Sequence, residues 1–168
     1  HSDVPSYEQN LTLQRARGGK RKIVLSTNIA ETSLTIPDVT IVINSCRMKE
    51  PSYDYAKSMS QLNTEFTSKA SMKQRAGRAG RVQAGICVHL ITKARAKNLP
   101  EFSKPEILRS PLEDVYMQVH NALSMGSESV VERLRTLPTP PEEKHVKAAI
   151  ERLKALDIVD KEGKLTIV

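Results

Sequence analysis

The amino-acid sequence predicts an α/β fold, in which a parallel sheet with flanking helices and a projecting β-hairpin precedes a helical, winged-helix domain. Two short apolar runs, at 22–25 and 39–43, are typical of buried strands. A third apolar run, at 86–91, follows a segment with helical character. Strands that alternate with helices favour an open α/β sheet, and about a dozen residues between the first two runs are compatible with a parallel crossover.

A hairpin and a helix connect the second strand to the third. The polar, imperfectly alternating segment 51–67 is typical of a β-hairpin, and we expect its tip around residues 60–63. The helix is expected over residues 69–81, with Ser68 or Ser71 as its N-cap.

The C-terminal part is expected to be helical. Ser110 as N-cap, Pro111 at the first position and Gly126 as stop delimit one helix. A second helix is expected over 142–156, and a turn at 161–164 follows it between two short apolar runs. A helix followed by a hairpin indicates a winged-helix unit.

Length and composition limit the classes of protein. The 168 residues suffice for one domain plus a small second one, and the change of character near residue 100 predicts domains at 1–100 and 101–168. The net charge of +7 favours an anionic partner such as nucleic acid. No apolar run approaches the ~18 residues of a membrane span, so no membrane partner is expected.

The two cysteines, Cys46 and Cys87, each lie inside an apolar stretch and show no metal-ligand spacing. We expect them to be buried, reduced thiols of an intracellular protein, in the nucleus or the cytoplasm. Because the sequence starts without Met, we also expect it to be a piece of a longer chain.

The strongest signal for function is the stretch "QRAGRAGR". On a helix, Gln74, Arg78 and Arg81 share one face. Gly77 and Gly80 cost helix stability, on the order of 1 kcal/mol each, which indicates that a ligand or another backbone comes close. Two arginines suit a multiply charged phosphate, and a glutamine beside them suits an attacking water. A solvated basic helix face is the alternative, but lysines would serve that purpose equally well.

A second stretch, "STNIAETSLTI", follows the first predicted strand. Ligands gather at the carboxyl ends of strands in an open α/β sheet. The side chains and N–H groups of Ser26, Thr27 and Asn28 are therefore suited to phosphate oxygens. Taken alone, this stretch is equally well interpreted as the N-cap of a following helix.

Together, the two stretches resemble motifs V and VI of the DEAH-box (DEAH/RHA) family of superfamily 2 RNA helicases. The start, "HSDVPSYEQ", is similar to the "HS-x-L-P-x-x-EQ" segment of that family, and "GICVHLIT" fits the part that follows motif VI. The resemblance covers residues 1–100 and implies a second RecA-like domain. The winged-helix interpretation of the remainder agrees with the usual domain order of the family.

The resemblance implies a role for each matching residue. Gln74 would position the lytic water, and Arg78 and Arg81 would be arginine fingers on the γ-phosphate. The hairpin over 52–67 would separate strands. The residues implied for RNA binding are His1, Ser2, Thr27 and Asn28. The residues implied for the nucleotide site, and for its coupling to RNA, are Ser33, Thr35 and Asp38, although Pro37 stands where family members often carry the ribose-binding Asp.

The resemblance also implies ATP and Mg²⁺, both bound mainly by a first RecA-like domain of the same chain, because the sequence has neither a G-x-x-x-x-G-K-[ST] loop nor an acidic D-E-x-H motif. The other implied partners are single-stranded RNA, held by its backbone, and protein cofactors. We expect an ATP-dependent RNA helicase whose present part is inactive alone. A non-catalytic RNA-binding scaffold is the alternative, and a winged-helix DNA-binding module would leave the glycine–arginine pattern unexplained.

Overall fold

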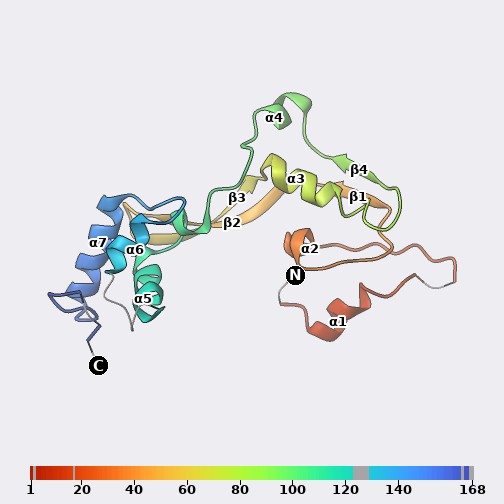
Figure 1. Cartoon of the computed structure of the whole chain (residues 1–168). Helices are drawn as coiled ribbons and strands as arrows, with labels where there is room; N and C mark the ends of the chain where they lie inside the picture. The colour runs from red at the N-terminus through yellow and green to blue at the C-terminus, as the bar shows by residue number, and fades with distance from the viewer. Residues whose placement is uncertain (2, 17, 123–128, 164, 167–168) are drawn as a thin grey trace. The chain divides into compact units, whose positions relative to one another are not determined.

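The computed structural model describes every residue of the chain except 2, 17, 123–128, 164 and 167–168. The chain forms two compact units, whose elements are labelled in Figure 1. Unit 1 consists of His1–Lys49 and Thr64–Ser103, and unit 2 consists of Glu50–Asn63 and Lys104–Val168. None of the described helices is long and apolar enough to cross a membrane. The domain assignment at 1–100 and 101–168 stays a prediction.

A parallel pair of strands forms the sheet of unit 1. β1 (Ile41–Asn44) pairs with β4 (Ile86–His89), in a register that sets Asn44 opposite His89. Helix α3 (Lys69–Ala76) packs against both strands. The predicted α/β fold with a parallel sheet and flanking helices is confirmed. β4 lies within the third apolar run, and β1 overlaps the second run and ends one residue beyond it.

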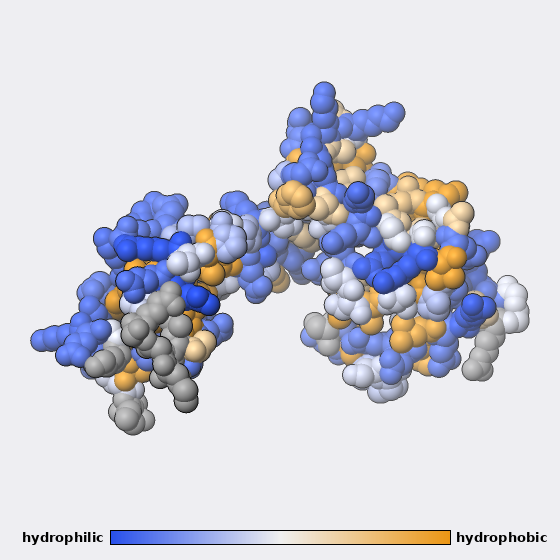
Figure 2. Space-filling model, in the orientation of Figure 1, coloured by the Kyte–Doolittle hydropathy of each residue, from blue (hydrophilic) through white to orange (hydrophobic). Residues whose placement is uncertain are grey.

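The two faces of this sheet differ. Side chains alternate between the faces along each strand, and Asn44 receives a hydrogen bond from Arg75, so its face lies towards α3. The opposite face carries apolar side chains with exposed fractions between 46% and 71%, namely Ile41, Ile43, Ile86 and Val88. Figure 2 shows this apolar surface in orange on the part of unit 1 that holds β1 and β4.

The first predicted strand, at 22–25, was wrong. In the described structure this stretch pairs with neither β1 nor β4, and Ile23 and Leu25 are 79% and 92% exposed. A parallel strand is buried only where a neighbouring strand takes its hydrogen bonds and a further layer covers its faces. The described residues supply neither to this stretch.

Three short helices complete unit 1. They are α1 (Ser6–Leu11), α2 (Ile29–Thr32) and α4 (Lys93–Lys97). Helices of this length are not stable in isolation, because nucleation costs more than so few hydrogen bonds return. The position of α2, which packs against α3, is therefore determined by its tertiary contacts.

Helix α3 is shorter than predicted. Of the two expected N-caps, Ser68 is the one that caps the helix, and its hydroxyl accepts a hydrogen bond from the Ser71 N–H. It ends at Ala76, however, rather than at residue 81, and beyond the Gly77 cap the N–H groups of Arg78 and Ala79 reach back only three residues, to the carbonyls of Arg75 and Ala76. Gly77 at the C-cap has a right-handed φ of −62°, so the early end agrees with the low helix propensity of glycine and needs no left-handed turn.

The hairpin consists of β2 (Arg47–Asp54) and β3 (Met59–Phe66). Its turn lies at residues 55–58, so the tip predicted at 60–63 was wrong. The Asp54 carboxylate accepts hydrogen bonds from the N–H groups of Ala56 and Lys57, and Ser58 has a φ of 51°. These local features set the turn, and strand alternation alone does not reveal them.

Unit 2 contains the helices of the C-terminal part. They are η1 (Glu106–Leu108), α5 (Leu112–Ala122), α6 (Val130–Arg135) and α7 (Glu143–Ala155). The predicted stop at Gly126 lies outside the described residues. An antiparallel bridge between Val159 and Leu165 follows α7, and the winged-helix assignment stays a prediction.

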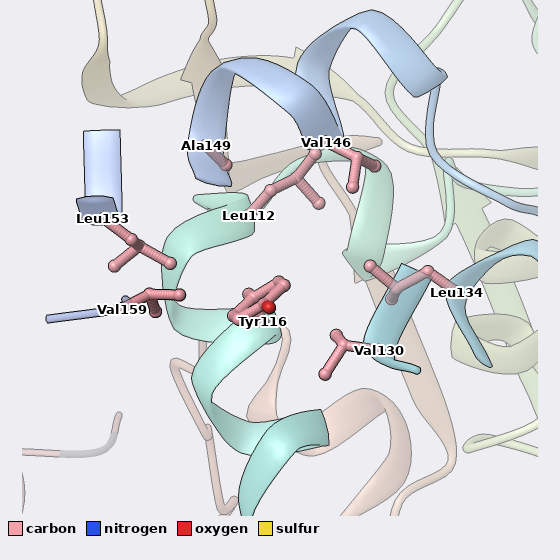
Figure 3. Packing of buried hydrophobic residues seen from close by; sticks show 8 residues of the cluster. All are labelled: Leu112, Tyr116, Val130, Leu134, Val146, Ala149, Leu153 and Val159. Carbon is pink, nitrogen blue, oxygen red and sulfur yellow. The ribbon is translucent and has the colours of Figure 1, made fainter. Parts of the chain in front are cut away.

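One apolar core holds unit 2 together. Figure 3 shows its buried members: Leu112, Tyr116, Val130, Leu134, Val146, Ala149, Leu153 and Val159. The hairpin turn also attaches within this unit. The Tyr55 ring stacks on His145, with centroids 4.1 Å apart and planes 6° apart, and its hydroxyl donates to the Ser110 carbonyl at 3.0 Å.

Candidate nucleotide and nucleic-acid site

An open depression of about 220 Å³ lies at the end of α3, and its lining residues are Gln74, Gly77, Arg78 and Arg81. Gln74 belongs to the helix, whereas both arginines follow it. The prediction that one continuous helix face carries all three side chains was therefore wrong. The structure nevertheless brings them together, because the tight turn after Ala76 keeps the chain beside the helix end. Their catalytic roles stay predictions.

The two arginines of the depression contact the "STNIAETSLTI" stretch. Arg78 Nη1 donates to the Leu34 carbonyl at 3.0 Å, and Nη2 donates to the Glu31 carbonyl. Arg81 Nη1 donates to the Thr35 hydroxyl at 2.8 Å. A guanidinium has five N–H donors, so these contacts orient each arginine and leave donors for a phosphate.

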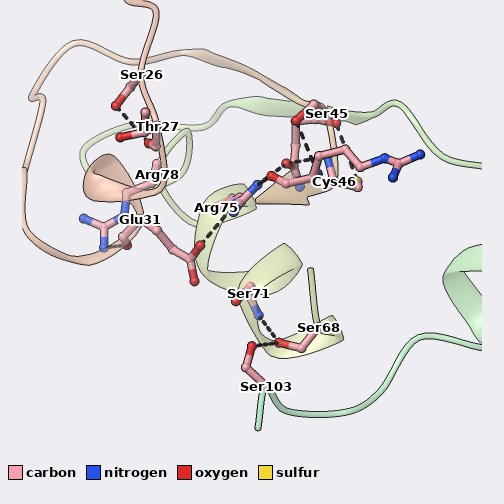
Figure 4. Close-up of polar contacts among 12 residues, drawn as sticks. Ser26, Thr27, Glu31, Ser45, Cys46, Ser68, Ser71, Arg75, Arg78 and Ser103 are labelled. Atoms are coloured by element: carbon pink, nitrogen blue, oxygen red, sulfur yellow. Dashed lines mark hydrogen bonds and ion pairs between the residues drawn. The ribbon is translucent and has the colours of Figure 1, made fainter. Parts of the chain in front are cut away.

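A third arginine, Arg75, is held more deeply. Its Nε donates to Glu31 Oε2 at 2.9 Å, and its Nη1 donates at 3.0 Å both to Asn44 Oδ1 and to the Arg47 carbonyl. The side chains of Arg75 and Glu31 are only 13% and 11% exposed. Figure 4 shows this contact between α2 and α3 beside Arg78.

Asn44 extends this contact into the sheet. It is buried, and its Oδ1 also accepts the Cys46 N–H at 2.9 Å, which fits the positive φ of 56° at Cys46. Its Nδ2 lies 3.1 Å from His89 Nδ1, on the paired strand. A polar chain thus runs from Glu31 through Arg75 and Asn44 to His89.

Thr27 and Asn28 precede α2, and both are exposed. Asn28 occupies the N-cap position, but its side chain makes no capping hydrogen bond. Of the two interpretations of this stretch, the N-cap interpretation is therefore not realised at Asn28. Both side chains are accessible to a ligand, and their contact with RNA stays a prediction.

Asp38 lies in a contact that the sequence did not predict. Its carboxylate forms an ion pair with Lys22 and accepts the Ala16 N–H at 3.3 Å. The hydrogen bond from Lys22 holds the pKa of Asp38 below its ordinary value, with the Ala16 N–H adding to the effect and desolvation opposing it. In this structure the carboxylate therefore fixes the chain near Lys22.

The other predicted residues are dispersed. Ser33 is exposed directly after α2, and Thr35 contacts Arg81. His1 is exposed and accepts the Asp3 N–H at 3.2 Å, whereas Ser2 lies outside the described residues.

Both thiols lie beside His89, at the end of the polar chain that starts at Glu31: Cys46 Sγ is 3.8 Å from His89 Nδ1, and Cys87 Sγ is 3.7 Å from His89 Nε2. The described residues contain no group of three or more His, Cys, Asp or Glu that fits a metal ion. Cys46 and Cys87 are free, the first fully buried and the second partly so. Burial raises the pKa of both thiols, which keeps them protonated and unreactive at neutral pH.

The sequence alone did not single out Glu31, Arg75 or Asn44. Arg75 stands inside the glycine–arginine motif, and Glu31 is the only carboxylate of "STNIAETSLTI". This charge complementarity was a usable signal for an ion pair between the two motifs. Asn44 gave no such signal, because a strand residue reveals its partner only through the register.

Comparison with known proteins identifies relatives of the whole chain. The family described as "Helicase conserved C-terminal domain" matches residues 1–83. "DExH-box ATP-dependent RNA helicase DExH2" of Arabidopsis thaliana is 46% identical over 166 residues, which are 99% of this chain and 10% of that protein. "ATP-dependent DNA/RNA helicase DHX36" of Homo sapiens is 43% identical over 166 residues, which are 99% of this chain and 16% of that protein.

A solved structure shares the fold. The chain in "Crystal structure of Escherichia coli DEAH/RHA helicase HrpB" is 33% identical, with a TM-score of 0.84, over 99% of this chain and 20% of its own. The present chain thus spans only 10% to 20% of the length of these proteins. Both helicase motifs, the parallel RecA-like sheet and these relatives agree, and the chain belongs to the DEAH-box (DEAH/RHA) family of superfamily 2 helicases.

Proposed function

We propose that the chain is the second RecA-like domain, with the start of a winged-helix domain, of an ATP-dependent RNA helicase. Gln74 holds the attacking water. Arg78 and Arg81 bind the γ-phosphate of ATP and stabilise the negative charge that develops on it. Thr27 and Asn28 contact the backbone of single-stranded RNA.

The observation that carries this proposal is the depression at the end of α3. An amide and two guanidiniums line it together with Gly77, and none of its lining residues is a carboxylate. A polyphosphate in this depression therefore meets hydrogen-bond donors without a competing anion. Arginine binds phosphate oxygens through two N–H groups at once, which fixes both distance and orientation.

The RNA side of the proposal uses the segment that precedes α2. Thr27 and Asn28 supply polar side chains for phosphate and sugar oxygens, which position a strand without reading its sequence. His1 and Ser2 add to this path. Ser33 and Thr35 follow α2, and the hydrogen bond from Arg81 to Thr35 connects this segment directly to the phosphate-binding side.

ATP and Mg²⁺ are held mainly by a first RecA-like domain of the intact protein, against which the present domain closes. When bound, Mg²⁺ neutralises charge on the phosphate oxygens. The two arginines of this chain complete the site from the opposite side. Closure and reopening shift the contacts of Thr27 and Asn28 along the RNA.

The test is ATP hydrolysis by the intact protein, measured with and without single-stranded RNA and, separately, single-stranded DNA. We expect RNA to raise turnover, and we expect Thr27→Ala with Asn28→Ala to raise the RNA concentration needed for half-maximal stimulation. DNA is included because the name of the human relative covers both nucleic acids. Stimulation by DNA alone would contradict the RNA assignment.

A non-catalytic scaffold gives a different result in the same experiment. Such a protein binds single-stranded RNA but hydrolyses no ATP above background in its presence. That outcome would refute the proposed enzymatic role while leaving the RNA-binding role intact.

A further inference from the structure

We propose that Arg75 is a positioning residue, which holds α2 and its flanking segments in register with α3 and thereby couples RNA binding to ATP hydrolysis. The inference rests on the proposed function of Gln74, Arg78 and Arg81. Arg75 itself contacts neither RNA nor nucleotide in this account. It acts by fixing Glu31.

Arg75 differs from the other two arginines in what it touches. Its guanidinium is mostly buried and reaches three acceptors on different elements: Glu31 on α2, Asn44 on β1 and the carbonyl of Arg47 on β2. Among the described residues, the side-chain hydrogen bonds of Arg78 and Arg81 go to the segment from Glu31 to Thr35. Arg75 therefore joins this segment to the sheet as well as to α3.

Helix α2 depends on this contact. It has four residues, too few to be stable by its own hydrogen bonds. The side chain of Glu31 anchors it through Arg75, and the carbonyl of Glu31 accepts from Arg78. Thr27 and Asn28 stand directly before α2, so the position of the RNA-binding side chains follows from where Glu31 is held.

The contacts of Arg75 are separate from the phosphate-binding depression, whereas Arg78 and Arg81 line it. A phosphate that enters the depression accepts from the remaining donors of Arg78 and Arg81, because these side chains line it. Arg75 does not line the depression, and its donors remain on Glu31 and Asn44. Arg75 thus keeps α2 in place while Arg78 and Arg81 bind the phosphate. The RNA-binding segment before α2 and the phosphate-binding depression therefore move together.

The experiment uses the intact protein with Arg75→Lys, Glu31→Gln and the double variant. Lysine keeps the charge of Arg75, but its single ammonium cannot reproduce the planar fork that meets three acceptors. Glu31→Gln keeps size and removes only the charge, so it serves as the milder variant if Arg75→Lys does not fold. The matched control is Arg135→Lys with Glu143→Gln, which alters an Arg–Glu pair that is 60% and 54% exposed.

ATP turnover is measured with and without single-stranded RNA, with thermal unfolding as a check on folding. We expect the ratio of stimulated to basal turnover to fall by about tenfold in each single variant, with basal turnover changed by no more than about twofold. The double variant should lose no more than either single variant, because both remove the same contact. The control pair should leave the ratio unchanged.

Three results would overturn the inference: an unchanged ratio, an equal loss of basal and stimulated turnover, or the same loss in the control pair. An equal loss would assign Arg75 a purely structural role. A parent protein that RNA does not stimulate would instead refute the proposed function, and the coupling role with it. The parent measurement thus separates the two failures.

Discussion

Glu31 and Arg75 are 44 positions apart in the sequence and form a nearly buried ion pair, with Arg75 Nε 2.9 Å from Glu31 Oε2. The pair joins the two sequence motifs that identify the family. Its charges are compensated by each other and by hydrogen bonds from Arg75 to Asn44 and to the Arg47 carbonyl. Such a pair is far more sensitive to the loss of one partner than an exposed pair is.

Glu31→Leu should therefore destabilise unit 1 by about 3–5 kcal/mol, because it leaves the Arg75 guanidinium buried without its counter-charge. The control is Glu143→Leu, which removes the 54% exposed partner of Arg135 and should cost no more than about 1 kcal/mol. Urea unfolding and amide hydrogen exchange in α3 and β1 measure the loss of stability in both variants. Equal losses in the two variants would show that Glu31 contributes no more than a surface charge.

Gly85→Ala should destabilise unit 1 by about 1–3 kcal/mol. A Cβ at this position would overlap the backbone of Ala79 and lie 2.7 Å from the Thr40 carbonyl oxygen. Neither neighbour is a flexible side chain, so the backbone itself must move. Gly80→Ala is the control, since nothing lies within 4 Å of its Cβ position. Hydrogen exchange of the β1 and β4 amides should separate the two variants, and similar protection in both would contradict this description of Gly85.

Leu153→Ala should cost about 2–5 kcal/mol in unit 2, because Leu153 is fully buried in the core cluster and its truncation leaves a cavity. Leu156→Ala, one turn later and 68% exposed, should cost less than about 1 kcal/mol. The free energy of unfolding of unit 2 is the measurement. A large loss of unfolding free energy in Leu156→Ala would contradict the exposed position of this side chain.

Stability of unit 1 should depend on pH through Asp38. Lys22 lowers the folded-state pKa of Asp38. The ionised Asp38 carboxylate therefore contributes to the stability of unit 1 at pH values above its unfolded pKa of about 3.9. That contribution falls as the pH drops towards the folded pKa. Asp38→Asn should therefore be less stable than the parent at pH 7, and this difference should shrink as the pH falls below the unfolded pKa. Asp3→Asn, with a carboxylate 88% exposed, is the control. Parallel pH curves for parent and Asp38→Asn would contradict the assignment.

Local patterns were sufficient to predict β1 and β4 and to narrow the N-cap of α3 to Ser68 or Ser71, because each depends on residues close in sequence. The predicted strand at 22–25 failed, since apolar content does not specify whether a partner strand is present. The hairpin tip was misplaced because Asp54 and Ser58 set the turn through hydrogen bonds and a left-handed backbone, neither of which follows from alternation.

The candidate site was predictable in composition but not in geometry. Gln74, Arg78 and Arg81 were identified from their residue types, yet the assumed helix stops at Ala76 and a turn brings the arginines to the depression. The anchoring by Arg75 was missed, because it depends on Asn44 and on the parallel register of β1 and β4. Contacts of that kind arise only when distant segments pack.

The central claim is that Arg78 acts on the γ-phosphate, and Arg78→Ala in the intact protein tests it most directly. RNA-stimulated kcat should fall by about 10³-fold or more. The Kd for single-stranded RNA should change by no more than about threefold, since the Arg78 side chain donates to the carbonyls of Leu34 and Glu31 and to no described residue of the predicted RNA-binding set. Arg135→Ala, an exposed arginine of unit 2, controls for loss of charge. Unchanged kcat in Arg78→Ala, or a loss of kcat that merely follows a loss of RNA binding, would contradict the account.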